Sequence, residues 1–78
     1  MTSDATVVYA GDYARVRKVL TAEGAPAWNV ERPLNGSIFL RYPLGRRHHA
    51  IAAAQEIEQL RGDFAQARMN LQRGRLMP

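Results

Sequence analysis

The chain has 78 residues with eleven basic and seven acidic side chains, a formal net charge of +4, and no cysteine. This length fits a single domain, and a domain so small buries only about 60% of the surface that its unfolded chain exposes. Because cysteine is absent, disulfides and thiolate metal sites cannot supply the missing stability. We therefore expect unusually good helix packing or an oligomer.

The composition also bears on location and partners. No apolar run approaches the length of about 20 residues that a membrane span needs, and the first residues lack the features of a secretory signal. We therefore expect a cytoplasmic protein with no membrane partner. Ten of the eleven basic residues are arginine, which either indicates nucleic-acid binding or reflects a general enrichment in arginine and alanine.

The first half of the chain predicts a strand followed by a helix. Residues 5–10 are β-branched and aromatic and end at a glycine, as in a short buried strand. Within residues 13–23, Val16, Val19 and Leu20 recur at helical spacing, and a glycine follows where a helix would end. We therefore predict a helix of three turns over residues 13–23.

The middle of the chain predicts a β-hairpin. Apolar and polar residues alternate through residues 26–31 and again through 37–42, and the Asn35-Gly36 dipeptide lies between the two runs. Phe39 lies on the opposite face from its apolar neighbours. We expect this ring to be either covered by a helix or exposed for a partner.

The last part of the chain is helical in pattern from about Arg46, with no proline before Pro78. A single helix of about 26 residues would reach roughly 40 Å, which exceeds the width of so small a domain. Gly62 favours an alternative in which the helix breaks and Asp63 caps a second helix. Both alternatives remain open at this point.

Together these elements predict an α+β fold, a βαββα two-layer sandwich with a three-stranded sheet and helices on one face. The whole chain, 1–78, forms one domain. Its core spans about residues 5–60, and residues 61–78 form a long C-terminal helix or helical arm.

A heptad pattern in the last helix suggests an interface. Apolar residues from position 50 to position 71 alternate spacings of three and four, and flanking charges would favour a parallel pair. The alternative is that the first half of this stripe packs on the protein's own sheet. The predicted oligomer or partner interface consists of Ile57, Leu60, Arg61, Phe64, Ala67, Arg68 and Leu71.

A second candidate site is the segment "GRRHH" at the start of the last helix. Free N–H groups at a helix N-terminus and two arginine side chains favour an anion such as phosphate. The alternative is that these arginines are solvated loop residues that protect a sheet edge. The predicted anion or nucleic-acid contacts are Arg46, Arg47, His48, Arg73 and Arg75.

No pattern in the sequence indicates catalysis. The adjacent residues His48 and His49 point about 100° apart on a helix and cannot bind one metal as an i, i+4 pair would. Glu56 and Glu58 fall on different helix faces, which argues against a paired acid and base. We therefore expect no enzyme activity, no catalytic residues, no metal and no cofactor.

The runs "VVYAGDYARVRKVLTAEGAPAWNVE" and "IFLRYPLGRRHHAIAAAQEIEQL" resemble the small ferredoxin-like domains of the DUF2007 type, described as prokaryotic signal-transducing proteins. The resemblance covers about residues 6–60 and consists of a strand, a helix that ends Leu20-x-x-x-Gly24, two strands and an alanine-rich helix. It implies the fold given above, and it assigns no functional residue.

We expect a small non-enzymatic, homo-oligomeric protein-binding adaptor or regulatory protein of a bacterium or a phage. The main alternative is a nucleic-acid-binding protein that uses the arginine-rich helix N-terminus and the C-terminal arm. A further alternative is a small-ligand sensor built on the sheet of a dimer.

Overall fold

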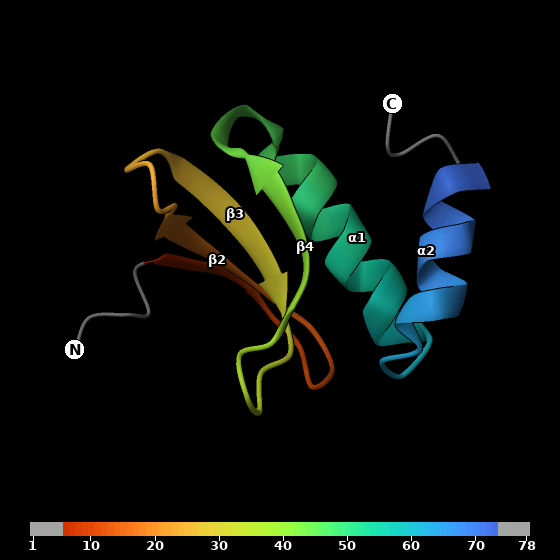
Figure 1. The fold of residues 1–78 in the computed structure, drawn as a ribbon. Coiled ribbons are helices and arrows are strands. Elements are labelled where there is room, and N and C mark those ends of the chain that lie inside the picture. The colour runs from red at the N-terminus through yellow and green to blue at the C-terminus, as the bar shows by residue number, and fades with distance from the viewer. Residues whose placement is uncertain (1–5, 74–78) are drawn as a thin grey trace.

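The computed structural model describes residues 6–73. Four strands come first along the chain, and two helices follow them (Figure 1). The elements are β1 (Val7–Ala10), β2 (Arg15–Leu20), β3 (Pro26–Glu31), β4 (Ile38–Pro43), the short 3-10 helix η2 (Leu44–Arg46), α1 (Arg47–Gln59) and α2 (Phe64–Arg73).

The strands form one antiparallel sheet in the order β1-β2-β3-β4, so each strand pairs with its neighbour in sequence. Helix α1 lies on one face of this sheet, and α2 packs against α1 on the side away from most of the sheet (Figure 1). The α+β class is therefore confirmed. The expected three-stranded sheet is wrong, because the sheet has a fourth strand.

The extra strand is β2, which lies where a helix was predicted over residues 13–23. Val16 and Val19 fit a helical spacing, but the residues around Val16 also alternate with period two. Val16 is buried against the helices, and the arginines on either side of it lie on the opposite face. The glycine after this segment does not end a helix. Gly24 has a φ of +82° and donates its N–H to the Thr21 carbonyl at 2.8 Å in the turn before β3.

The hydrophobic core lies between the sheet and the helices. Small side chains on α1 let the helix approach the sheet closely. The indole of Trp28 fixes the segment between β4 and α1, because its Nε1 donates to the Leu44 carbonyl at 2.8 Å. The buried members of the core are Ala14, Val16, Trp28, Val30, Tyr42, Ala50, Ala53, Ala54, Ile57, Ala67 and Leu71.

A tight turn separates α1 from α2. The N–H of Gly62 donates to the Ile57 carbonyl at 2.9 Å, and both Arg61 (φ +53°) and Gly62 (φ +88°) are left-handed. Asp63 then caps α2, because its side chain accepts the N–H of Gln66 at 3.2 Å. The break at Gly62 and the cap at Asp63 are confirmed. The single long helix is wrong, and α2 folds back beside α1.

Strand β4 contains an irregularity that settles the position of Phe39. Ile38 and Leu40 both pair with β3, and Phe39 lies between them where the register shifts. Its ring lies 5.0 Å from the ring of Phe64 on α2, and the guanidinium of Arg32 lies 4.6 Å from the Phe39 ring centre. Phe39 is therefore covered by a helix, the first of the two alternatives.

Neither helix among residues 6–73 is long and apolar enough to cross a lipid bilayer.

The turn between the helices gives a first prediction. Gly62→Ala should lower the free energy of unfolding by about 1 kcal/mol or more, because alanine is strained at a left-handed φ. Gly45→Ala is the matched control, since the φ of Gly45 is not left-handed and an added methyl group meets no atom within 4 Å. Urea unfolding of both variants measures the difference. Equal losses would contradict the assignment of the turn.

Candidate functional site

The face of the sheet opposite α1 has a polar centre. In the strand register, Arg17 pairs with Asn29 and Asn29 pairs with Arg41, so these three side chains form a row across β2, β3 and β4. Arg15 pairs with Glu31 one step along the same face. We call these five residues the arginine face. No helix within residues 6–73 covers it (Figure 1).

Glu31 is the buried anion of the arginine face. It is 0% exposed, and its carboxylate accepts hydrogen bonds from Arg15 Nε at 2.8 Å, from Arg17 Nε at 2.9 Å and from Arg17 Nη2 at 3.3 Å. Arg15 Nη2 also donates to it. Burial alone would raise the pKa of Glu31, but the hydrogen bonds and charges of the two arginines outweigh burial and lower it. Glu31 is therefore ionised at neutral pH and holds both guanidinium groups in place.

Arg41 is anchored differently from the other two arginines. Its Nε donates to Asn29 Oδ1 at 2.8 Å, and Asn29 is itself buried. The Arg41 side chain is exposed, and its two terminal nitrogens have no hydrogen-bond partner among the described residues. The guanidinium is thus fixed at its base and free at its outer edge, the edge that binds planar acceptors in a bidentate manner.

The arginine face carries more positive than negative charge. Three guanidinium groups oppose one carboxylate, which leaves a net charge of about +2 on these five residues. Neighbouring strands lie about 4.8 Å apart, so the row from Arg17 to Arg41 spans roughly 10 Å. A rigid cationic row of this size suits an anionic partner with repeated charges.

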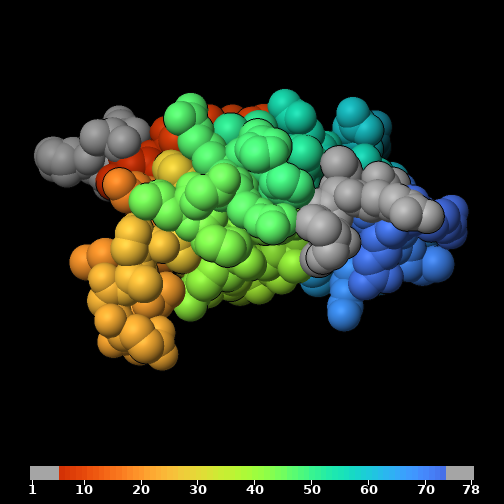
Figure 2. Space-filling view, turned by 90° about the horizontal axis from the view of Figure 1, so that it is seen from above, coloured from red at the N-terminus to blue at the C-terminus, as the bar shows by residue number. Residues whose placement is uncertain are grey.

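The residues predicted from the "GRRHH" segment lie at one end of the molecule. Arg46, Arg47 and His48 are exposed at the start of α1, where no side chain caps the helix and no acidic residue occupies its first turn. Arg73 is exposed at the end of α2, which points toward the same end of the molecule (Figures 1 and 2). Arg75 lies outside the described residues. Because α2 folds back beside α1, its C-terminal end lies at the same end of the molecule as Arg46 and Arg47 (Figure 1).

His49 adds no charge to this end. Burial lowers the pKa of His49, and the charges of His48 and Arg46 lower it further, so the imidazole is neutral at pH 7. Its Nδ1 atom is buried without a hydrogen-bond partner, as is the hydroxyl group of Tyr42. Burial also raises the pKa of Tyr42. Residues 6–73 contain no group of three or more side chains suited to hold a metal ion.

The residues predicted as an oligomer interface divide into buried and exposed groups. Three apolar members are already enclosed by the chain's own core, and the two arginines are exposed on the outside of the helices. The buried members are Ile57, Ala67 and Leu71, the partly buried members are Leu60 and Phe64, and the exposed members are Arg61 and Arg68. Most of the apolar residues of the predicted interface are therefore already covered by other parts of the same chain.

Glu58 connects the end of α1 to the loop between β1 and β2. Its carboxylate accepts the backbone N–H groups of Asp12 at 3.0 Å, Tyr13 at 2.8 Å and Ala14 at 3.1 Å. A methyl group added at Gly11 would lie 2.3 Å from Glu58 Oε1, so glycine is needed beside this carboxylate. Three consecutive N–H groups around one anion form a strong local lock. This lock fixes the loop and is structural.

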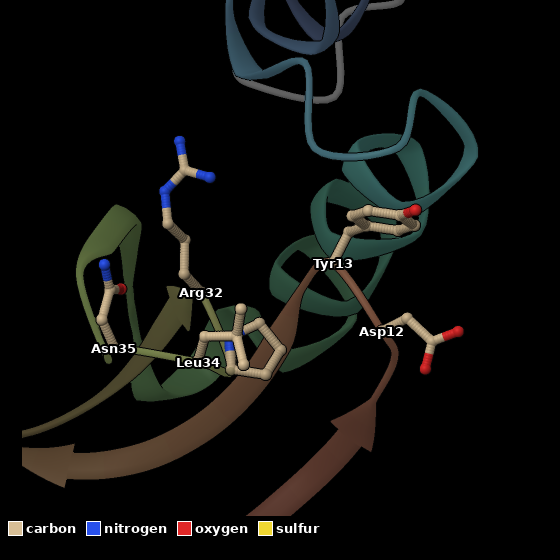
Figure 3. A pocket seen from close by; sticks show the side chains of 6 residues that line it. Asp12, Tyr13, Arg32, Leu34 and Asn35 are labelled. Atoms are coloured by element: carbon tan, nitrogen blue, oxygen red, sulfur yellow. The ribbon is translucent and has the colours of Figure 1, made fainter.

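A pocket of about 280 Å³ lies between the β1–β2 loop and the β3–β4 loop. Asp12 and Tyr13 approach it from one loop, and Leu34 and Asn35 approach it from the other (Figure 3). Leu34 is 98% exposed, so the rim is open to solvent. The polar ends of Asp12, Arg32 and Asn35 point in different directions (Figure 3), so these side chains form no convergent set of polar groups.

Comparisons of this chain with protein families, with curated proteins and with solved structures found no match. The resemblance to DUF2007-type domains stays an expectation, and one of the elements on which it rests, the helix before Gly24, is a strand in this structure.

Arg15, Arg17 and Arg41 are not among the site residues predicted from the sequence. Arg15 and Arg17 fall within the helix predicted over residues 13–23, and Arg41 falls at a polar position of the alternating segment 37–42. The signal that could have found them is the alternation of Arg15 and Arg17 about Val16, which places both arginines on one face of a strand.

The lock at Glu58 gives a second prediction. Glu58→Gln should lower the free energy of unfolding by about 1 to 3 kcal/mol. Three backbone N–H groups share the two acceptor oxygens of the carboxylate, and the amide would offer them only one acceptor oxygen. Glu23→Gln, in the exposed turn between β2 and β3, is the control and should change stability by less than about 0.5 kcal/mol. Thermal and urea unfolding give both values. The role of the lock is refuted by a loss no larger than that of the control.

The buried carboxylate gives a third prediction. Arg15→Met combined with Arg17→Met keeps long side chains over Glu31 but removes both positive partners. At pH 7 the double variant should lose about 3 to 5 kcal/mol, because an ionised carboxylate is left buried and unpaired. Burial then raises the pKa of Glu31, so protonation should make the loss smaller at pH 4.

Urea unfolding at both pH values measures this effect. In the unmodified protein the pKa of Glu31 is lowered, so its contribution is present above about pH 4.3 and is lost as the pH falls through the folded pKa. A third change, Glu31→Met, should restore most of the stability at pH 7. A loss that is the same at pH 4 and pH 7 would show that Glu31 is not the cause.

Proposed function

We propose that this protein binds nucleic acid and that the arginine face is its binding surface. The observation that carries this proposal is the row Arg17–Asn29–Arg41 on the uncovered side of the sheet, with Arg15 beside it. The only carboxylate of the arginine face is buried beneath two of these arginines. Phosphate groups of a nucleic acid would therefore meet guanidinium groups and no exposed acid on this surface.

Preorganisation supports the proposal further. Arginine side chains normally lose considerable conformational entropy when they bind, but here Glu31 and Asn29 already hold the guanidinium groups through hydrogen bonds. Less freedom is then lost on binding, which favours affinity. Arg46 and Arg47, which follow β4 in the chain, are also exposed and add positive charge at the start of α1.

The homo-oligomeric adaptor has less support from this geometry. It rests on the heptad pattern, on the charges beside that pattern and on a helix longer than its domain. The apolar residues of the predicted interface are buried or half-buried within the chain, and the helix breaks and folds back as α2. The small-ligand sensor also has little support, because the pocket beside Leu34 is open and has one acidic and one basic side chain at its wall. Neither alternative has an observation as specific as the arginine face, so nucleic-acid binding is the function that we propose.

The proposal predicts salt-dependent binding, the fourth prediction. Fluorescence anisotropy with labelled 20-nucleotide single strands and duplexes should show binding at low salt. The slope of log affinity against log salt should be about 0.7 to 0.9 for each phosphate contacted. Arg41→Ala should weaken binding about tenfold. The double variant Arg46→Ala with Arg47→Ala should have a smaller slope, by an amount that corresponds to the loss of up to about two phosphate contacts.

Arg68→Ala is the matched control, because it removes the same charge from an exposed position on α2, on the far side of α1 from the arginine face. Its affinity should stay close to that of the unmodified protein. Thermal unfolding of every variant shows whether it is folded. The proposal fails if no nucleic acid binds at the lowest salt, or if Arg68→Ala weakens binding as much as Arg41→Ala.

A further inference from the structure

The placement of the aromatic side chains bears on which nucleic acid the arginine face fits. Proteins that bind single strands use exposed aromatic rings on which unpaired bases stack. All six aromatic residues of the chain lie within the described residues, and none lies on the arginine face. They are Tyr9, Tyr13, Trp28, Phe39, Tyr42 and Phe64.

Each aromatic ring has a position on the helix side of the molecule. Trp28 and Tyr42 are buried in the core, and Tyr9 pairs with core residue Val16 and packs against the same cluster. Phe39 and Phe64 contact each other, as described above. Tyr13 packs beside Gly62 in the turn between the helices. The arginine face therefore offers unpaired bases no aromatic ring to stack on, which favours a duplex over a single strand as its ligand.

The spacing of the two outer arginines suits a duplex groove. The strands that carry Arg17 and Arg41 lie roughly 10 Å apart, so both side chains can reach one major groove of B-form DNA, which is about 12 Å wide. The major groove of an RNA duplex is too deep and narrow for side chains to enter. Of the nucleic acids, B-form DNA thus has the groove that best accepts this surface.

The three arginines of this face are not equivalent. Arg15 and Arg17 each use a terminal nitrogen as well as Nε to bind Glu31. Arg41 bonds Asn29 only through Nε, so both of its terminal nitrogens are without a hydrogen-bond partner among the described residues. Two parallel N–H donors match the O6 and N7 acceptors that guanine presents in the major groove.

We infer that the arginine face enters the major groove of duplex DNA and that Arg41 reads a guanine there, with Asn29 as the positioning residue that orients it. This inference rests on the proposed function. Arg15 and Arg17, whose guanidinium groups are partly occupied by Glu31, then contact the phosphate backbone on which the register of the complex depends.

The test is a selection from duplexes with a randomised 12-base-pair centre, followed by affinity measurements on the selected sequence. The unmodified protein should select at least one fixed guanine. Replacing that guanine by 7-deazaguanine removes the N7 acceptor and should weaken binding roughly tenfold. Replacing it by inosine removes only the minor-groove amino group and should leave the affinity nearly unchanged.

Arg41→Lys separates base reading from charge. Lysine keeps the positive charge but lacks the planar fork, so this variant should bind random duplexes within about threefold of the unmodified protein and should not discriminate against 7-deazaguanine. Asn29→Ala should reduce the same discrimination, which a purely structural role of Asn29 would leave intact. Arg47→Lys is the matched control and should retain the selected guanine.

The outcomes distinguish this inference from the proposed function. Tighter binding to single strands or to RNA duplexes, the absence of any selected guanine, or a guanine preference that survives Arg41→Lys would each overturn the inference and leave nucleic-acid binding in place. The absence of binding to every nucleic acid would overturn the proposed function itself.

Discussion

The constraint on which this fold depends is that one helix, α1, covers only one face of the four-stranded sheet, while α2 packs behind α1 (Figure 1). The inner strand β3 is nevertheless buried on both sides after its first residue. On the side toward α1, Trp28 and Val30 pack into the apolar core. On the other side, Asn29 and Glu31 are buried beneath arginine side chains of the adjacent strands. The uncovered face is therefore closed by polar side chains in place of a second layer.

This arrangement links stability to the candidate function. A buried carboxylate is tolerated only where its charge is paired and its oxygens accept hydrogen bonds, and Glu31 meets both conditions through Arg15 and Arg17. The same contacts hold these two arginines on the surface in fixed orientations. A change that releases the arginines thus exposes the sheet as well, so the stability of β3 and the shape of the surface depend on the same side chains.

Local patterns in the sequence predicted part of this structure. The hairpin of residues 26–43, the start of α1 and the break at Gly62 follow from alternation, turn residues and helix-breaking glycine. The strand β2 was not predicted, because the spacing of Val16 and Val19 fits a helix whereas the alternation of the arginines about Val16 fits a strand, and tertiary pairing decided between the two. The ion pairs of Glu31 and the lock at Glu58 join residues 14 to 46 positions apart, so no local pattern could have indicated them.

The lock at Glu58 has a consequence for the order in which the chain folds during its synthesis. The loop between β1 and β2 is made early, but its N–H groups obtain their acceptor only when the end of α1 has been made, 46 residues after Asp12. Because closing so long a segment costs chain entropy, the first hairpin gains this support last. The sheet and the helices then become stable together. Until α1 has been synthesised, the strands already made have to avoid pairing with other chains.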